Sequence, residues 1–502
     1  MKYYMGIDMG GTMVKAAIFS QFGEEIAVSE QKLKVIYPGK EMVERDVYEA
    51  KKAVYHVIKM VIQKSQIESS AIGGIGVTGQ ANGMYLFDQN GNPARNAVLS
   101  SDTRAKKYVK KWNENGTWKS ILPKIRQQIW AGNVPALLAW FQDHEPESLE
   151  KASVVVTAKD YIRYLLTGEF ALEITEASGI ASMDQEKKQI TEEIYRELGI
   201  EKWLDLFPKR ILECTEIAGS VTPECAKLTG LKEGTPVVGG QMDTGACIIS
   251  TGVTEENQLG IIVGTWGINS IVKKKPVTDE NIFMVYKYCI PEMYCVMEGS
   301  STSATNLEWF IDTFVKDYGL ENVYGFCNKL VEEADYNDTL FFLPFLYGSN
   351  VGPDAKSAFI GLEARHGKKE MLRAIYEGVA FCHKYHIERL RKYIEKLDVV
   401  RMAGGAARSS VWMQLFADVL GVPVEISKAS ELGAMGVAME AAVGTGLYPD
   451  IKSAVSDWVK IKAIYQPNPE KVKFYEKKYQ VYKKIIYQLD SIWGELDGLE
   501  EK

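Results

Sequence analysis

Apolar and polar residues alternate in the first segment of the chain and then change to a helical spacing. Tyr3–Asp8 predicts a short strand, Met9–Thr12 a turn and Met13–Phe19 a second strand, because glycines supply the backbone freedom of a tight turn. Asp46 and Glu49 form a capping box ahead of the next apolar pattern. Its three- and four-residue spacing predicts an amphipathic helix whose apolar face contains Val47, Ala50, Val54, Val57, Ile58, Val61 and Ile62.

Further along, Ile72–Thr78 predicts a strand, Gly79–Gly83 a loop, and Met84–Phe87 a strand that turns at Asp88–Gly91. The C-terminal stretch has the spacing of a helix with lysines between its apolar positions, which are Val472, Tyr475, Tyr479, Tyr482, Ile486 and Leu489. We interpret it as a last helix packed on the second domain. The alternative is a basic amphipathic helix on a membrane surface.

The opening pattern returns in outline about 250 residues later. Gly260–Val263 predicts a strand, Gly264–Gly267 a turn and Ile268–Val272 a second strand. Val399–Ala403 then enters a glycine turn, as Ile75–Gly79 does in the first half. We interpret the chain as two diverged copies of one α/β unit. The boundary is placed just after Gln241-Met242-Asp243, which gives domains 1–245 and 246–502.

Composition narrows the functional classes. The 502 residues have 46% hydrophobic residues, 59 Lys+Arg and 66 Asp+Glu, a net charge of −7. This balance, without a long basic block, argues against a nucleic-acid partner. No apolar run approaches the ~18 residues that span a bilayer, and the start lacks the apolar region of a secretory signal. Seven cysteines without a C-x-x-C pair favour reduced thiols in the cytoplasm, and His383 and His386 are interpreted as structural or exposed residues.

Two common nucleotide motifs are matched only in part. Gly74-x-Gly76-x-x-Gly79 fits the dinucleotide fingerprint in letters, but its third glycine leads into a loop and strand instead of a helix. Gly361–Lys368 has one residue too many for a P-loop, and Lys369 stands where Ser or Thr is needed. We therefore set aside both a Rossmann dehydrogenase and a Walker-type site.

The two Gly-Thr turns suit phosphate, since their backbone N–H groups can converge on an anion. The first contains Gly10, Gly11 and Thr12, and the second contains Gly264 and Thr265. Asp8 precedes the first turn and is placed to hold Mg²⁺, while Lys15 adds positive charge. Gly404-Gly405-Ala406-Ala407-Arg408-Ser409 is a third candidate contact, for the nucleoside. Each turn taken singly is also compatible with a purely structural hairpin.

These motifs together resemble the FGGY family of carbohydrate kinases, in the actin/Hsp70/sugar-kinase superfamily. Gly6–Thr12 with Lys15 is similar to the family's first phosphate motif, Gly264–Trp266 to its second, and Gly404–Ser409 to its adenosine motif. Ser357–Glu377 matches the second family signature, whereas the first is partial because Leu137 replaces its usual Lys. The resemblance, over residues 5–445, implies two actin/Hsp70-like (ribonuclease-H-like) α/β domains flanking an interdomain cleft, with ATP and Mg²⁺ as cofactors.

Within the family, several runs resemble kinases of L-xylulose or 3-keto-L-gulonate. They are Asn96–Ala105, Arg126–Glu147, Asn306–Phe310 and Phe341–Gly352. Gly348-Ser349-Asn350 and Gln80-Ala81-Asn82 depart from the D-pentulose kinases. D-xylulose, D-ribulose and the sugar alcohols erythritol and glycerol stay open as alternatives.

A sugar kinase needs a base near the attacking hydroxyl. Asp243 follows the strand Val237–Gly239 and stands at the family's catalytic position, although capping the helix 244–251 is a second interpretation. Gln80, Asn82 and Asp102 lie on first-domain loops and offer polar groups to sugar hydroxyls, or serve only as turn residues. An actin- or Hsp70-like ATP switch and an inactive sugar sensor are the competing functions. A homodimer is left open.

Overall fold

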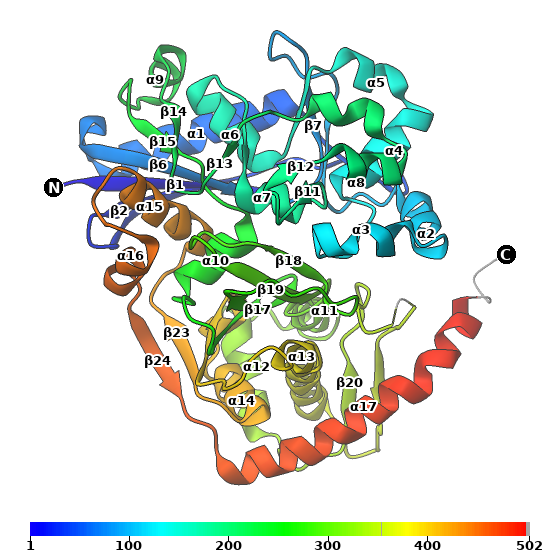
Figure 1. Cartoon of the computed structure of the whole chain (residues 1–502). Helices are drawn as coiled ribbons and strands as arrows, with labels where there is room; N and C mark the ends of the chain where they lie inside the picture. The colour runs from blue at the N-terminus through cyan, green and yellow to red at the C-terminus, as the bar shows by residue number, and fades with distance from the viewer. Residues whose placement is uncertain (353, 498–502) are drawn as a thin grey trace. The chain divides into compact units, whose positions relative to one another are not determined.

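In the computed structural model, which describes residues 1–352 and 354–497, two structural units each contain a mixed β-sheet (Figure 1). The first unit comprises Met1–Thr254, Val272–Val296 and Ala429–Lys460. The second comprises Glu255–Ile271 and Met297–Lys428, and it continues from Ile461 to the C-terminus. The assignment of separate roles to 1–245 and 246–502 stays a prediction.

The first unit is built on a six-stranded sheet in the order β14-β15-β6-β1-β2-β3. Its strands are β1 (Tyr3–Met9), β2 (Met13–Ser20), β3 (Glu25–Lys32), β6 (Ile72–Gly79), β14 (Ile217–Ser220) and β15 (Pro236–Val238). β1 pairs antiparallel with β2 and parallel with β6. The predicted opening hairpin is therefore confirmed. All three glycines of the apparent dinucleotide fingerprint lie inside β6, which confirms that no helix follows the third.

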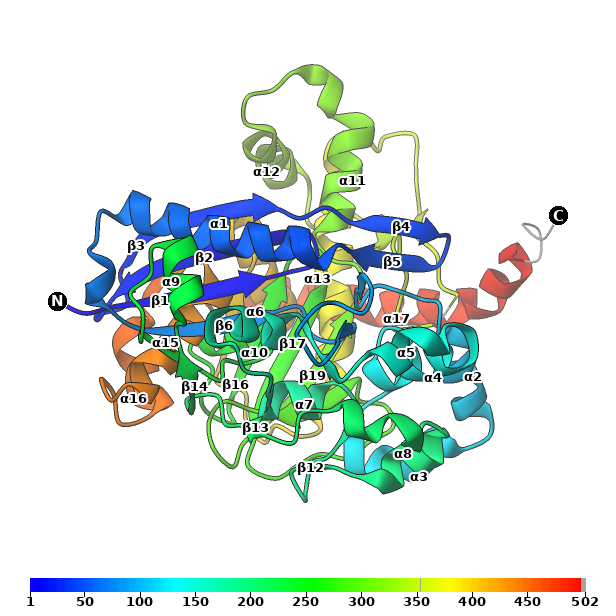
Figure 2. The ribbon, with the colours of Figure 1, turned by 90° about the horizontal axis from the view of Figure 1, so that it is seen from above.

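The two faces of this sheet are covered by different helices. On one face, Met5 and Ile7 join a core with α1 (Val47–Ser65) and α6 (Ala158–Thr167), and Figure 2 shows α1 lying along β2 and β3. The predicted cap of α1 is confirmed, because the Asp46 side chain accepts hydrogen bonds from the Tyr48 and Glu49 amides. On the other face lies α15 (Leu432–Gly444), from the late part of the chain (Figure 1).

Glycines in β1 and β6 let the backbone of α15 contact the backbone of the sheet directly. A Cβ atom on Gly6 would lie 1.9 Å from the Ala434 carbonyl oxygen, and one on Gly76 would lie 1.9 Å from the Val437 carbonyl oxygen. Alternate residues of a strand point to the same face. Asp8, two residues after Gly6, therefore lies on the α15 face of β1. Gly76 serves packing against α15, and a Cβ atom on Gly79 would meet the Met9 carbonyl oxygen at 2.9 Å. Close packing therefore explains these glycines of the apparent nucleotide fingerprint.

Smaller elements complete the first unit. Its remaining strands are β4 (Ile36–Gly39), β5 (Met42–Arg45), β7 (Tyr85–Phe87), β8 (Ala97–Val98), β9 (Val154–Val156), β10 (Leu172–Glu173), β11 (Met183–Asp184), β12 (Gln189–Ile190), β13 (Ile211–Leu212) and β18 (Met284–Lys287). Its remaining helices are α2 (Lys106–Glu114), α3 (Thr117–Ile125), α4 (Val134–His144), α5 (Pro146–Lys151), α7 (Ile174–Gly179), α8 (Glu192–Leu198), α9 (Pro223–Thr229), α10 (Asp243–Ser250) and α16 (Ile451–Trp458). Leu137 is fully buried in α4, so this position belongs to the apolar core.

The second unit repeats the strand pairing of the first. β16 (Gln258–Val263) pairs antiparallel with β17 (Gly267–Lys273) and parallel with β22 (Val399–Ala403), as β1 does with β2 and β6. The predicted duplication of one α/β unit is thus confirmed at the level of topology. The other elements are β19 (Tyr294–Ser300), β20 (Phe341–Leu343), β21 (Ala358–Ile360), β23 (Val424–Ser427), β24 (Ile461–Tyr465), α11 (Thr305–Phe314), α12 (Val323–Glu333), α13 (Lys368–Arg391), α14 (Ser410–Leu420) and α17 (Pro469–Asp497).

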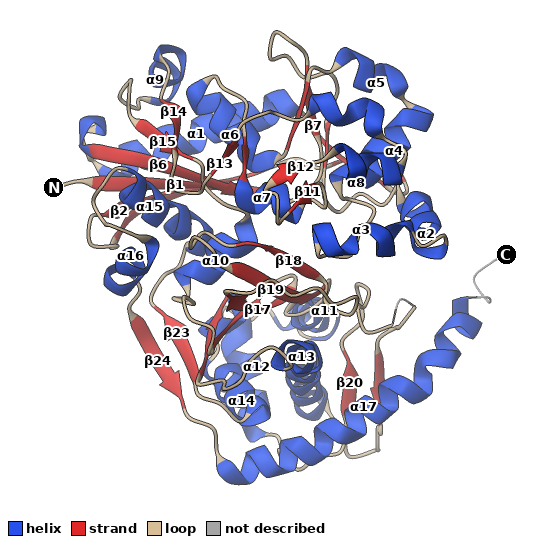
Figure 3. Cartoon of the chain, viewed as in Figure 1, coloured by secondary structure: helices blue, strands red, loops and turns tan. Residues whose placement is uncertain are grey.

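The last helix, α17, is the long C-terminal helix drawn in blue in Figure 3. Tyr475, Tyr479 and Tyr482 are completely buried, and the Tyr475 hydroxyl donates to Glu377 of α13 at 3.1 Å. The packed-helix interpretation is confirmed, since these side chains are not available to a membrane. Among the helices of the described residues, none is long and apolar enough to cross a bilayer.

Candidate active site

The turn between β1 and β2 presents two free amide groups. The Gly10 amide donates to the Met13 carbonyl at 2.9 Å and closes the turn. The N–H groups of Gly11 and Thr12 have no acceptor within the described parts of the chain. Thr12 is exposed, and Gly11 is half-buried. The turn therefore has the free donors that an anion site requires.

Asp8 and Lys15 lie beside this turn with a residue that the sequence analysis did not single out, Glu431. Lys15 Nζ lies 3.0 Å from Glu431 Oε2, and Glu431 directly precedes α15. No N–H or O–H group in residues 1–352 or 354–497 donates to the half-buried Asp8 carboxylate. Burial raises the pKa of Asp8 to about 6, Lys15 opposes this shift, and Glu431 adds to it.

The start of α15 closes over Asp8. A Cβ atom on Gly433 would lie 2.3 Å from Asp8 Oδ2, so a larger residue here would have to displace the Asp8 carboxylate. The first turn of a helix carries unpaired N–H groups and partial positive charge. The partial positive charge of the helix start therefore acts in the same sense as Lys15, but burial outweighs it and the pKa of Asp8 stays raised. Sequence reasoning missed this contact because it joins residues more than 400 positions apart.

Asp243 is the first residue of α10, and its side chain is half-buried. Its Oδ1 accepts a hydrogen bond from the Thr244 amide at 2.7 Å. The interpretation as a helix cap is wrong, because the N-cap residue is Met242 and has no capping side-chain bond. Burial, followed by the charge of Asp8, raises the pKa of Asp243 to about 7. The structure thus brings the two acids predicted at the site into one electrostatic environment.

The three candidate sugar contacts differ in how their polar groups are occupied. Asn82 is fully buried, accepts a hydrogen bond from Asn133 Nδ2 and donates to the Gly179 carbonyl at 3.4 Å. Asp102 is fully buried and accepts hydrogen bonds from the Val43 amide and from Arg104. Their contact with a sugar stays a prediction, and it would compete with these internal bonds.

Gln80 differs from the other two. The residue is buried, with 7% of its surface exposed, yet its Nε2 has no hydrogen-bond partner among the described residues. Its Oε1 lies 3.2 Å from where a Cβ atom on Gly11 would stand. The Gln80 amide is therefore beside the phosphate turn and keeps a free donor.

Behind these loops, α6 and α7 carry buried charges that sequence reasoning also missed. Lys159 is fully buried, with its Nζ 2.6 Å from Asp160 Oδ1 and 3.5 Å from Glu173 Oε2. Glu176 accepts a hydrogen bond from the Asn82 amide at 3.1 Å, and burial raises its pKa well above the ordinary value. The only signal of this network in the sequence is Lys159, a lysine within an apolar helical pattern.

The second unit brings its two predicted loops together. Gly264, in the turn after β16, accepts a hydrogen bond from the Ala304 amide at 2.9 Å. Gly404 has a φ of 98°, and a Cβ atom there would lie 2.5 Å from the Val263 carbonyl oxygen. The glycine turn after β22 thus packs on the end of β16. Arg408 and Thr265 are exposed beside these turns.

Comparison with protein families decides the assignment. The model of the N-terminal domain of the FGGY family of carbohydrate kinases matches residues 3–250, and the C-terminal domain model matches residues 259–445. The chain belongs to the FGGY family of carbohydrate kinases. It is therefore a sugar phosphotransferase, and kinases of this family use ATP as phosphate donor.

Individual relatives of the kinase match over almost its whole length. The L-xylulose/3-keto-L-gulonate kinase of Escherichia coli (strain K12) is 35% identical over 490 residues, 97% of each chain. The probable L-xylulose kinase of Pasteurella multocida is 35% identical over 493 residues, 98% of this chain and all of the relative.

The solved structure of a ligand-bound xylulose kinase from Lactobacillus acidophilus has a TM-score of 0.91 and 23% identity, and the match covers 99% of this chain and all of that one. The predicted fold class, α/β with two actin/Hsp70-like, ribonuclease-H-like domains, is confirmed.

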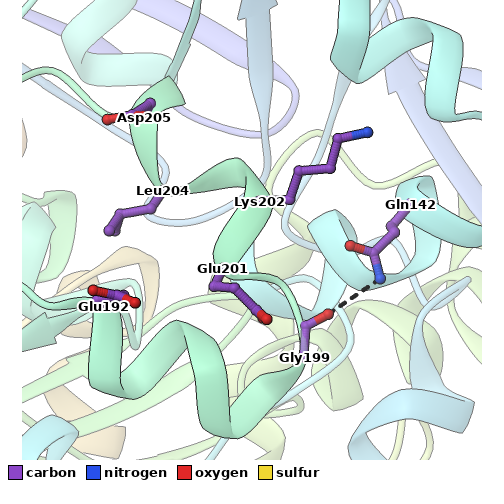
Figure 4. A pocket seen from close by; sticks show the side chains of 7 residues that line it. All are labelled: Gln142, Glu192, Gly199, Glu201, Lys202, Leu204 and Asp205. Atoms are coloured by element: carbon purple, nitrogen blue, oxygen red, sulfur yellow. Dashed lines mark hydrogen bonds between the residues drawn. The ribbon is translucent and has the colours of Figure 1, made fainter.

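A pocket elsewhere on the first unit contains none of the predicted site residues. It is lined by Gln142 and by residues of α8 and the following turn, and Gln142 Nε2 donates to the Gly199 carbonyl at 3.1 Å across it (Figure 4). Figure 4 shows Glu192, Glu201, Lys202 and Asp205 around it, so the lining mixes both signs of charge. We assign it no part in the reaction.

Proposed function

We propose that this kinase transfers the γ-phosphoryl group of ATP to the terminal hydroxyl of a ketopentose, with L-xylulose or 3-keto-L-gulonate as substrate. The observation that carries the chemistry is Asp243, whose pKa is raised to about 7 by burial and by Asp8. A base is most effective when its pKa lies near the working pH. The names of the two 35% identical relatives support the choice of sugar.

In the proposed reaction, Asp243 accepts the proton of the sugar hydroxyl as its oxygen attacks the γ-phosphorus. The free amides of Gly11 and Thr12 and the charge of Lys15 stabilise the phosphoryl oxygens. In the second unit, Gly264, Thr265, Gly404, Gly405 and Arg408 are proposed nucleotide contacts. Gln80, with its free amide, is the strongest candidate among the proposed sugar contacts.

The first unit also suits a magnesium ion. Asp8 is a hard oxygen ligand without a hydrogen-bond donor in the described residues, and its charge is destabilised by burial. Mg²⁺ bound there would neutralise charge on the transferring phosphoryl group. We infer that Asp8 holds the ion. A homodimer and a cytoplasmic location also stay predictions.

A coupled ADP-release assay tests the substrate assignment. The panel contains L-xylulose, 3-keto-L-gulonate, D-xylulose, D-ribulose, L-ribulose, glycerol and erythritol. We expect the highest kcat/KM for one of the first two. A higher value for D-xylulose than for both would contradict the choice of sugar and leave the kinase assignment intact.

D-xylulose is the second candidate because relatives named xylulose kinase match almost the full chain, for example one from Bacillus subtilis at 27% identity.

A further inference from the structure

Arg45 is a buried arginine placed behind the phosphate turn. It is the last residue of β5 and is 1% exposed. Its Nη2 donates to the Gly10 carbonyl at 3.2 Å and to the Gly11 carbonyl at a shorter distance. Its Nη1 donates to the Tyr85 hydroxyl at 3.4 Å. One guanidinium thus binds the carbonyl groups of two successive residues of the turn, Gly10 and Gly11.

Because the peptide bond is planar, a contact that fixes the two carbonyl groups also fixes the direction of the N–H groups on the other side of the same peptides. In a trans peptide the C=O and N–H groups point in opposite directions within one plane. The Gly10 carbonyl shares its peptide with the Gly11 amide, and the Gly11 carbonyl shares its peptide with the Thr12 amide. When both carbonyl groups face Arg45, both amides therefore face away from it. These are the two amides without an acceptor among the described residues.

Arg45 is also unusual because it is a buried charged residue without an ion pair among the described residues. In the part of the chain that the structure describes, no carboxylate lies within ion-pair distance of its guanidinium, and its Nε has no partner. A buried charge without an ion pair is costly to keep. Glu44, its neighbour in sequence, is engaged with Arg95 and Arg104 instead. The negative charge that would balance Arg45 is therefore expected from outside the protein.

We propose that Arg45 is a positioning residue that holds the Gly10–Thr12 turn in its anion-binding form, so that its charge is balanced when nucleotide phosphate binds. This inference rests on the proposed role of the turn in ATP binding. Arg45 itself touches no substrate. It acts through the orientation of two peptide groups and by polarising them, since a hydrogen bond to a carbonyl strengthens its amide as a donor.

The test compares four variants of the full-length kinase. Arg45→Met removes both donors and charge, Arg45→Gln keeps a neutral donor, and Arg45→Lys keeps the charge without the planar fork. Tyr85→Phe is the matched control, because it removes only the third partner of Arg45 and leaves the turn contacts. Each protein is measured for KM of ATP, KM of sugar, kcat, melting temperature and the rise in melting temperature with ADP.

We expect Arg45→Met and Arg45→Gln to raise the KM of ATP by about tenfold or more and to lower kcat, because two charge-assisted bonds are lost. The KM of the sugar should change less than about twofold, since the variants leave the proposed sugar contacts unaltered. The rise in melting temperature with ADP should be small or absent. Arg45→Lys should fall between these variants and the wild type, and Tyr85→Phe should match the wild type.

A merely structural role would lower the melting temperature of the Arg45 variants and leave the KM of ATP and kcat at wild-type values, and that result overturns the proposal. If Arg45→Met does not fold, Arg45→Lys and Arg45→Gln decide by the same criterion. If the wild type phosphorylates no sugar of the panel, the substrate assignment fails. The ADP-induced shift still decides the role of Arg45, because loss of that shift in the variants supports it and its retention contradicts it.

Discussion

Replacing Asp243 by Asn tests the reactivity and the stability cost of one carboxylate together. Asn has the same shape and can still accept the hydrogen bond of the Thr244 amide, but it cannot take up a proton. We expect kcat to fall by about two orders of magnitude or more, the range for loss of a general base. The KM values of ATP and sugar should change little.

The same variant should be more stable than the wild type above neutral pH. The pKa of Asp243 is raised from 3.8 to about 7, so the folded state binds the proton more tightly than the unfolded state does. Below about pH 3 both states are mostly protonated and the carboxylate costs almost nothing. The cost grows as pH rises to about 7, where 1.36 kcal/mol per pKa unit gives about 4 kcal/mol as an upper limit.

Solvent reaches this half-buried side chain, so a gain of about 1–2 kcal/mol is expected in practice. Thermal melting without nucleotide or divalent ions, at pH 4.5 and pH 8, measures it. Asp205→Asn, at an exposed acid paired with Lys209, serves as the control. Near-normal turnover of Asp243→Asn would remove this residue from the mechanism. Equal melting temperatures of variant and wild type at pH 8 would contradict the electrostatic argument.

Three further changes test other parts of the structure. Asp8→Ala should abolish most turnover and weaken the response to Mg²⁺ in a titration, whereas an unchanged Mg²⁺ requirement would remove Asp8 as the ion's ligand. Gly433→Ala should displace the Asp8 carboxylate and lower kcat by about 10–100-fold with a small change in melting temperature, while Gly494→Ala, where a Cβ meets nothing within 4 Å, should leave kcat unchanged. Burial, with a smaller contribution from His386, lowers the pKa of His383 to about 3, so the stability from its neutral form is lost as pH falls below 6.5. His383→Gln should therefore lose about 2 kcal/mol less than the wild type between pH 6.5 and 5, and parallel pH profiles would refute this assignment.

The parts of the fold that follow from local sequence were predicted well. The hairpin around Gly10–Thr12 and the cap at Asp46 depend on short-range spacing, and the structure has both. The strands β16, β17 and β22 were predicted because the same local pattern occurs twice in the chain, and the structure adds that β22 pairs parallel with β16.

Tertiary contacts account for what the sequence could not indicate. Gly76 looked like part of a nucleotide motif, yet its purpose depends on α15, more than 350 residues later. Asn82 looked available to a sugar, but it is bonded to Asn133, which lies 51 residues away and is coupled to it by no local pattern. Asp102 is bonded to Arg104, only two residues later, and to the amide of the distant Val43. The residue type predicts which bonds a side chain can make, and only the fold decides which partner is present.

The position of α15 also determines when the first unit can be completed during synthesis. Its sheet is encoded before Thr254, whereas the segment that contains α15 begins at Ala429, 175 residues later. At roughly 5–20 residues per second, the ribosome needs about 9–35 s to cover that distance. Throughout this interval the glycine-lined face of β1 and β6 is without its helix, and a nascent chain in that state is a candidate for chaperone binding. Asp8 is among the first residues made, and the helix start that closes over it is among the last.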